Sequence, residues 1–258
     1  YLTLLGICIG IFAVVSLITL SNGLKLAVGS QFGVSSTELI TVEGAGNGFG
    51  HPGSGQVNPL TQRDLQEIEK LSSVKAAVGR VIVAGKIEFN NKVVFGYATN
   101  IPSGKDRDIL YQQIEAKTAV GRLLKDSDSG KILLGYNFYA NKVGLGREIV
   151  PGNKVNIQGR DFEVVGIVEK KGSFIFDNIV FMNERDIESL YGSIEEWDFI
   201  NVLPRDKKEI DKTKEDIEKL LRRLRDVKVG EEDFTVSTPE ASLEQVNSIL
   251  NAITIFIV

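Results

Sequence analysis

Charged residues are absent from both ends of the chain and frequent in between. Residues Tyr1–Leu24 carry no charge, and an apolar run, Ile249–Val258, closes the sequence. About 20 consecutive apolar residues are enough to cross a bilayer as a helix. We therefore predict that residues 1–24 hold a first transmembrane helix and the start of a linking helix. Residues 239–258 are predicted to form a second linking helix that continues into a second transmembrane helix.

Each end has an alternative interpretation. A secretory signal peptide is the alternative for the first run, although the apolar core of such a peptide is shorter and follows a basic start. A buried C-terminal helix is the alternative for residues 245–258, which are too few to span a bilayer alone. Because the first residue is not Met and the last lies inside an apolar run, we expect the chain to be part of a longer polypeptide.

Residues 36–100 begin with an alternation of strand and helix. A short strand is predicted at residues 39–43, followed by a glycine-rich loop. Thr61 and Asp64 then form a capping box that starts a helix. The strands predicted after this helix are residues 77–83, 86–90 and 92–97, with Asn90-Asn91 as a tight turn before the last.

Residues 197–238 repeat the same order. A strand at residues 199–203 precedes a helix that Asp206 caps, and a strand at residues 234–237 follows it. Each end of the middle region thus supplies a β-α-β piece. Two such pieces can share one sheet with both helices on one face.

Residues 101–196 have a different pattern, which predicts short strands separated by turns. Asn183 and Gly192 mark the start and the end of a short helix. The other predicted elements are strands at residues 131–134, 154–158, 162–169 and 179–182, and a helix at 136–143. We interpret this stretch as a mixed, β-rich subdomain inserted into the first unit, so the predicted fold class is α+β.

Composition excludes two classes of function. The 30 Lys and Arg and 34 Asp and Glu give a net charge of −4, without the basic excess that nucleic-acid binding requires. The single cysteine, Cys8, lies in the first apolar run, so the middle region has neither a disulfide nor a cysteine-based zinc site.

No catalytic, cofactor-binding or metal-binding residues are predicted. Gly-Lys pairs occur at Lys86, Lys105 and Lys131, but none has the spacing of a phosphate-binding Walker A loop. Asp126 and Asp128 resemble part of a calcium loop, yet the glycine comes one position early and the twelfth position is not Glu. A polar turn is the better interpretation of that segment.

The pattern of the glycine-rich segment 44–56 does not indicate a dinucleotide-binding site. Gly48, Gly50 and Gly53 match GxGxxG formally, but Pro52 interrupts the strand-to-helix turn that such a site needs. His51, the one histidine, lies in the same segment without a nucleophile motif beside it. A flexible surface loop is the simplest interpretation.

The chain resembles the MacB-like (FtsX-like) permease subunits of ABC transporters. The stretches that carry the resemblance are Leu4–Ile11, Pro59–Leu65, Gly121–Leu124, Pro151–Ile157, Phe162–Val168, Asp233–Glu240 and Gln245–Leu250. They occur in the family's order over nearly the whole chain.

The resemblance implies a four-span permease with a large extracytoplasmic domain between spans one and two, here residues about 25–240 in an inner cell membrane. That domain would have a porter-like part made of the two β-α-β pieces, with the subdomain of residues 101–196 inserted between them. The family works as a homodimer with a cytoplasmic ATPase, which holds the ATP on another chain or domain. In bacteria with two membranes, a periplasmic adaptor protein joins it.

We therefore expect a transport protein without chemistry of its own, which exports or extrudes a peptide, drug or lipoprotein-like substrate. Its predicted coupling residues are Gly6 and Gly10 in span packing, and Pro239, Glu240, Gln245 and Asn247, where the outer domain meets the second span. The alternative is a membrane-anchored binding or sensor module without an ATPase. An extracytoplasmic enzyme is disfavoured because the sequence lacks a catalytic set.

Overall fold

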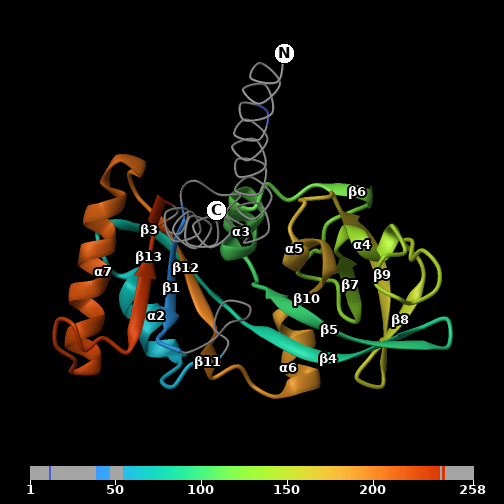
Figure 1. Cartoon of the computed structure of the whole chain (residues 1–258), viewed down its shortest axis with the longest axis horizontal. Helices are drawn as coiled ribbons and strands as arrows, with labels where there is room; N and C mark the ends of the chain where they lie inside the picture. Colours follow the sequence, from blue (N-terminus) through green and yellow to red (C-terminus); the bar gives the residue numbers. More distant parts are fainter. Residues whose placement is uncertain (1–11, 13–38, 47–54, 239, 242–258) are drawn as a thin grey trace, which may run out of the picture.

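The structure is a computed structural model that describes residue 12 and residues 39–46, 55–238 and 240–241 (Figure 1). In this part of the chain, no helix has both the length and the apolar character needed to cross a membrane. The predicted membrane segments, residues 1–24 and 239–258, lie outside the described residues apart from Phe12, Glu240 and Ala241.

The first unit is a four-stranded antiparallel sheet built from both ends of the described chain. Its strand order is β13-β1-β12-β3, with β1 (Ile40–Gly44), β3 (Val74–Arg80), β12 (Phe199–Pro204) and β13 (Phe234–Ser237). Helices α2 (Gln62–Glu69) and α7 (Ile210–Arg225) contact each other and pack on this sheet, at the left of Figure 1. The two predicted β-α-β pieces therefore share one sheet.

Both helices start where the sequence predicts. The Thr61 hydroxyl accepts from the Asp64 amide at 3.2 Å, and the Asp64 carboxylate accepts from the Thr61 amide at 2.9 Å, which completes the capping box of α2. The Asp206 carboxylate accepts from the Lys208 amide and starts the short 3-10 helix η1 (Lys207–Glu209), which leads into α7. The helix starts are thus fixed by local chemistry.

The second unit is a seven-stranded sheet whose two ends meet. Its strand order is β6-β9-β7-β10-β5-β4-β8. The strands are β4 (Ile82–Phe89), β5 (Lys92–Ile101), β6 (Thr118–Gly121), β7 (Lys131–Leu134), β8 (Lys154–Ile157), β9 (Arg160–Val168) and β10 (Ile179–Asn183). Because β8 also pairs with β9, six of the strands close into a ring, and β6 pairs with the far half of β9.

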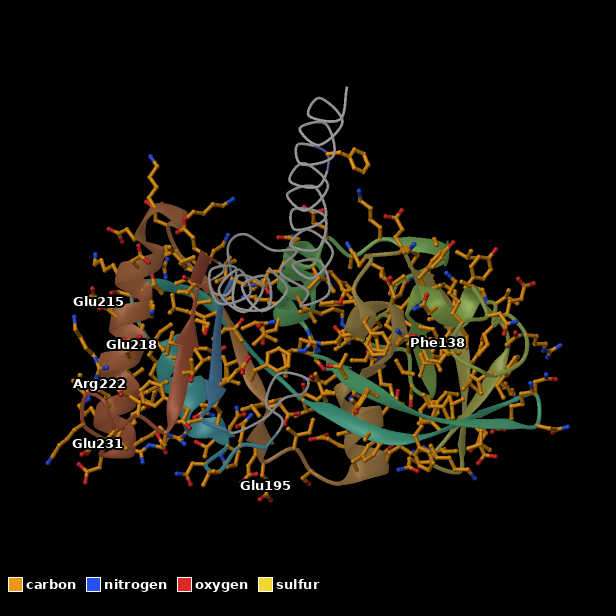
Figure 2. All side chains as sticks on the ribbon, viewed as in Figure 1. Phe138, Glu195, Glu215, Glu218, Arg222 and Glu231 are labelled. Atoms are coloured by element: carbon orange, nitrogen blue, oxygen red, sulfur yellow. The ribbon has the colours of Figure 1, made fainter. Side chains whose placement is uncertain are left out.

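Apolar side chains fill the ring and also cover part of its outside. Phe138, from α4 (Tyr136–Tyr139), is 1% exposed and lies in a large core cluster that continues from the ring into the first unit (Figure 2). A second cluster joins Phe181 of β10 to Leu110 of α3 (Lys105–Gln113), with α5 (Phe174–Asn178) packed beside it. Strand β10 is buried along its whole length, which explains its continuous apolar sequence.

The two sheets meet at Val81, whereas the predicted division lay at residue 100. Residues 77–83 were predicted as one strand, but β3 ends at Arg80 in one sheet and β4 begins at Ile82 in the other. Strands β4 and β5 thus belong with the inserted region, not with the range 36–100. Apolar residues are buried on both sides of Val81, so the hydropathy pattern does not change at the crossing.

Other local predictions were confirmed or missed for identifiable reasons. Asn90 and Asn91 have φ of 52° and 57°, as the predicted tight hairpin turn between β4 and β5 requires. Helix α3 was missed because its apolar residues, Ile109 to Tyr111, are consecutive and lack helical spacing. Only packing against the outside of the ring identifies it. The remaining elements are α6 (Glu184–Tyr191), β2 (Leu60–Thr61) and β11 (Glu196–Trp197).

Candidate functional site at the junction of the two sheets

Two connections at the ends of first-sheet strands lie side by side: one leads from β3 into the ring, and the other leads into β12 from β11, which forms a small two-stranded sheet with β2. Val81 connects β3 to β4, and Asp198 connects β11 to β12. The Asp198 amide donates to the Arg80 carbonyl at 2.9 Å, and the Asp198 carboxylate accepts from the Ile82 amide at 2.5 Å. The two connections are therefore hydrogen-bonded to each other.

A buried arginine and a buried asparagine fasten these connections to the ring. Arg80 donates to the Thr99 hydroxyl at 2.8 Å and to the Asn100 amide oxygen at 3.3 Å. The same Asn100 oxygen accepts from the Val81 amide. Asn100, which is 0% exposed, donates in turn to the Gly79 carbonyl and to Glu184 at the start of α6. One side chain of β5 thus holds the end of β3 and the first turn of α6.

The charge of Arg80 has no carboxylate directly against it in the described part of the chain. Burial lowers the pKa of Arg80 to about 10, with Tyr111 and Glu184 acting weakly in the opposite direction. Burial also raises the pKa of Glu184. An isolated charge is costly to bury unless hydrogen bonds satisfy it. The neutral acceptors Thr99 and Asn100 supply those bonds, so the network depends on every member.

A tryptophan packs beside the junction, between the end of β3 and α2. Trp197 is 6% exposed, and its indole nitrogen donates to Gln62 of α2 at 3.1 Å. A Cβ atom on Gly79 would lie 2.3 Å from this ring. Only glycine at this position of β3 leaves room for the indole ring beside the strand. Trp197 is thus part of the hydrophobic core.

A partly buried arginine, whose side chain is 10% exposed, ties together the first unit. Arg225, in the last turn of α7, donates to Asp233 at 2.8 and 3.0 Å and to Asp64 of the α2 capping box at 3.0 Å. It also donates to the carbonyls of Asn58 and Pro59. Asp233, the last residue of the acidic run 231–233, is therefore a structural contact.

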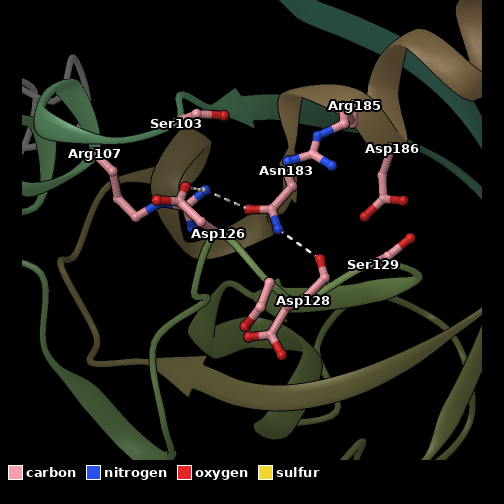
Figure 3. Close-up of a pocket in the computed structure, with 9 residues that line it drawn as sticks. Ser103, Arg107, Asp126, Asp128, Ser129, Asn183, Arg185 and Asp186 are labelled. Atoms are coloured by element: carbon pink, nitrogen blue, oxygen red, sulfur yellow. Dashed lines mark hydrogen bonds and ion pairs between the residues drawn. The ribbon is translucent and has the colours of Figure 1, made fainter.

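A small polar cavity of about 130 Å³ lies beside the start of α6 (Figure 3). Its lining residues are Ser103, Arg107, Asp126, Ser127, Asp128, Ser129, Asn183, Arg185 and Asp186. Asp126 lies 2.9 Å from Arg107 in an ion pair, and Asp128 pairs with Arg122 at 2.5 Å. The hydrogen bonds from Arg122 hold the pKa of Asp128 well below its usual range. The acidic side chains that resembled a calcium loop are thus paired with arginines.

Asn183 occupies the centre of this cavity wall. It was predicted to cap α6, and the helix does begin after it, but its side chain makes no capping bond. Its amide instead accepts from Arg107 at 2.8 Å and donates to the carbonyls of Lys125 and Asp128 (Figure 3). Within residues 39–46 and 55–238 no cluster of His, Cys, Asp or Glu could hold a metal ion. The cavity is a structural polar network.

Most of the predicted coupling residues lie outside the described residues: Gly6, Gly10, Pro239, Gln245 and Asn247. Glu240 is described, and it is exposed and helical. The Thr238 hydroxyl accepts from the Ala241 amide at 3.2 Å, which is the geometry of a helix cap. The predicted start of a helix after β13 agrees with this contact, while the role of Thr238 was missed.

Arg80, Asn100 and Asp198 were also missed by sequence reasoning. The one signal was a charged residue inside the apolar segment 76–83. Which acceptors that charge would meet depends on the contact between two sheets, and spacing along the chain does not encode it.

Comparison with known proteins identifies the relatives of the chain. The family described as the MacB-like periplasmic core domain matches residues 1–220. An uncharacterised ABC transporter permease of Methanocaldococcus jannaschii is 32% identical over 258 residues, which are 100% of this chain and 62% of that permease. The macrolide export ATP-binding/permease protein MacB of Hyphomonas neptunium is 29% identical over 177 residues, or 67% of this chain and 26% of that protein. The chain thus spans less than two thirds of these relatives.

Solved structures share the fold. The periplasmic region of MacB from Actinobacillus actinomycetemcomitans superposes with a TM-score of 0.61 at 19% identity, covering 82% of this chain and 93% of that one. The extracellular domain of the noncanonic ABC-type transporter YknZ from Gram-positive bacteria gives a TM-score of 0.57 at 16% identity, covering 77% and 99%. Because the sequence profile matches most of the chain and the permease relative matches all of it, this protein belongs to the family of the MacB-like periplasmic core domain.

Proposed function

We propose that this chain is the outer domain, with its flanking membrane segments, of a permease subunit in an ABC transporter of the MacB type. The domain would transmit ATP-driven motion so that a substrate is exported or extruded. The observation that carries the proposal is the junction at Val81 and Asp198. A domain that transmits motion must move as one body, and a buried network holds its two sheets together there.

The membrane and the partners follow from the same proposal. The uncharged residues 1–24 and the apolar residues 249–258 would enter a cell membrane and leave residues about 25–240 outside the cytoplasm. A cytoplasmic ABC ATPase would bind the ATP, and two copies of the permease would form a homodimer. A periplasmic adaptor would join where the host has two membranes. Several relatives are named for macrolide export, which makes drugs and peptides the first substrates to test.

The coupling role of the C-terminal link can be tested in the complete transporter. One glycine inserted after Pro239 interrupts the helix that Thr238 caps. We expect the transporter, reconstituted in liposomes with its ATPase, to keep basal ATP hydrolysis and lose substrate-stimulated hydrolysis and export. A glycine inserted after Gly230, in an exposed loop, is the matched control and should leave both intact.

Two results would contradict the proposal. Export unchanged by the insertion after Pro239 would show that the link does not transmit force. A chain whose gene lies beside no ATPase gene, and whose purified form stimulates no ABC ATPase, would instead favour a membrane-anchored sensor.

A further inference from the structure

The hairpin of β4 and β5 carries an exposed apolar stripe on the outside of the ring. Val93 is 48% exposed, Phe95 86% and Tyr97 46%, and the three alternate along β5 on one face of the strand. A phenylalanine that is 86% exposed in the middle of a strand is costly in water. Such a stripe commonly marks a surface that another molecule covers.

The edge of β5 beside this stripe is open. β5 pairs with β4 from Lys92 to Thr99, but its pairing with β10 begins only at Tyr97. For Lys92–Gly96, no described backbone group donates to or accepts from the second edge of the strand. Every second residue of this segment therefore has its N–H and C=O groups directed outward. An open, apolar strand edge is a template for a further strand.

We propose that a second copy of this chain covers this edge, with the two β5 strands paired antiparallel about a two-fold axis at Val94. This pairing rests on the homodimer in the proposed function and gives it a defined contact. The two rings would then be joined by a sheet in the order β4-β5-β5-β4.

The sequence of the edge is complementary to itself in this register. Val93 of each copy lies opposite Phe95 of the other, which makes two pairs of an aromatic with a β-branched residue, a favourable cross-strand combination. Lys92 lies opposite Gly96, so no like charges meet. A two-fold contact needs this kind of self-complementarity, because the same patch must serve both partners.

Charges on β4 agree with the same register. Glu88 is the neighbour of Val93 in the hairpin, and Lys86 is the neighbour of Phe95. Each row across the combined sheet then reads Glu88, Val93, Phe95, Lys86, with an apolar centre and opposite charges at its two ends. Within one copy Lys86 and Glu88 already form an ion pair at 2.5 Å, so neither charge is left isolated.

The contact is too small to hold two free domains together. Five residues of strand edge bury well below the roughly 800 Å² per partner of a standard interface. Two chains held in one membrane need less, because tethering raises their effective concentration by orders of magnitude. The proposal therefore predicts a contact that depends on the complete, membrane-bound chain.

Cysteine cross-linking in membranes tests the contact directly. In a Cys8→Ser background, Val94→Cys places one cysteine per copy on the two-fold axis, within the Cα distance of a disulfide. Lys86→Cys, one strand further from the edge, is the matched control. We expect mild oxidation to give roughly ten-fold more covalent dimer for Val94→Cys than for Lys86→Cys. Adding Phe95→Glu should abolish the cross-link, and circular dichroism should show an unchanged fold because Phe95 is exposed.

Three outcomes would overturn the proposal. They are a Val94→Cys cross-link no stronger than that of Lys86→Cys, a cross-link that survives Phe95→Glu, or an adduct whose mass belongs to another protein. Native electrophoresis of the same membranes in mild detergent detects the homodimer independently of the β5 contact. A dimer that forms without the Val94 cross-link would overturn the β5 contact and leave the permease homodimer in place.

Discussion

Asn100 shows how much one side chain can hold together in this domain. It satisfies the Arg80 charge, the Val81 amide and the Gly79 carbonyl, and it reaches Glu184 in another element. Because it is fully buried, no water can replace these bonds. Residue-scale predictions follow for this side chain, for Gly79 and for Asp128.

Asn100→Leu should destabilise the domain strongly. The substitution removes the acceptor of a buried charge and leaves two backbone groups unpaired, which we expect to cost about 3–5 kcal/mol. Chemical denaturation followed by circular dichroism measures the loss. Asn156→Leu, at a half-buried residue whose amide nitrogen donates to the exposed Asp161, is the control and should change stability by less than about 1 kcal/mol. Equal losses for both variants would contradict the role of the network.

Gly79→Ala should be poorly tolerated because the new methyl group would meet the Trp197 ring. We expect a loss of about 1–3 kcal/mol in the free energy of unfolding. Trp197→Leu also destabilises alone, but the double variant should lose less than the sum of the two by about 1 kcal/mol. Strict additivity in this double-mutant cycle would show that the steric contact is not the cause.

Asp128 predicts a pH dependence of stability. Its pKa is lowered in the folded state by Arg122, so its ion pair stabilises the fold at neutral pH. As pH falls below about 4, the unfolded chain binds a proton at this carboxyl before the folded chain does, and that stability is lost. Asp128→Asn should therefore be less stable than wild type at pH 7, with a difference that shrinks toward pH 2–3. A difference independent of pH would contradict this assignment.

At the scale of elements, α7 is held by an apolar stripe along its length and by ion pairs in its last turn. Its buried stripe, Ile217, Leu220 and Leu221, follows from helical spacing and packs in the core of the first unit. Its outer face, where Glu215 lies in Figure 2, carries exposed i,i+4 ion pairs such as Lys219 with Glu215, which contribute little. Its last turn is fixed by Arg225, which connects α7 to the start of α2 and to β13.

Arg225→Ala should release three elements together. Two carboxylates and two carbonyls lose their donor, and the side chain is only 10% exposed, so we expect a loss of about 2–4 kcal/mol. Hydrogen exchange should rise at the start of α2 and in β13. Arg223→Ala, at an exposed position two residues away, should cost less than about 0.5 kcal/mol. A uniform rise in hydrogen exchange over both units would contradict a local role of Arg225.

At the scale of the whole molecule, the two sheets should behave as one body. Spin labels at Lys219→Cys in α7 and Lys154→Cys in β8, in a Cys8→Ser background, should give a narrow distance distribution. Asn100→Ser, whose hydroxyl replaces only part of the amide's bonds, should broaden it. A pair at Lys219→Cys and Lys70→Cys, both in the first unit, should stay narrow. A broad distance distribution between the two units in the protein with an unaltered junction would contradict the transmission of motion through the junction.

Much of the fold can be predicted from the sequence because its causes are local. These local features depend on residues within a few positions of each other: the capping box at Thr61, the cap at Asp206, the Asn90-Asn91 turn and the bounds of β13. The absence of a catalytic set and the family resemblance also come from the residues themselves.

Only the tertiary structure decided where the two sheets meet and what holds them. The hydropathy pattern does not change where the chain crosses at Val81, since both sheets bury apolar residues near this point. Asn183 and Arg80 found partners more than 15 residues away, and the open edge of β5 exists because β10 begins late. Pairings between distant segments depend on which surfaces meet on folding, and no local pattern specifies them.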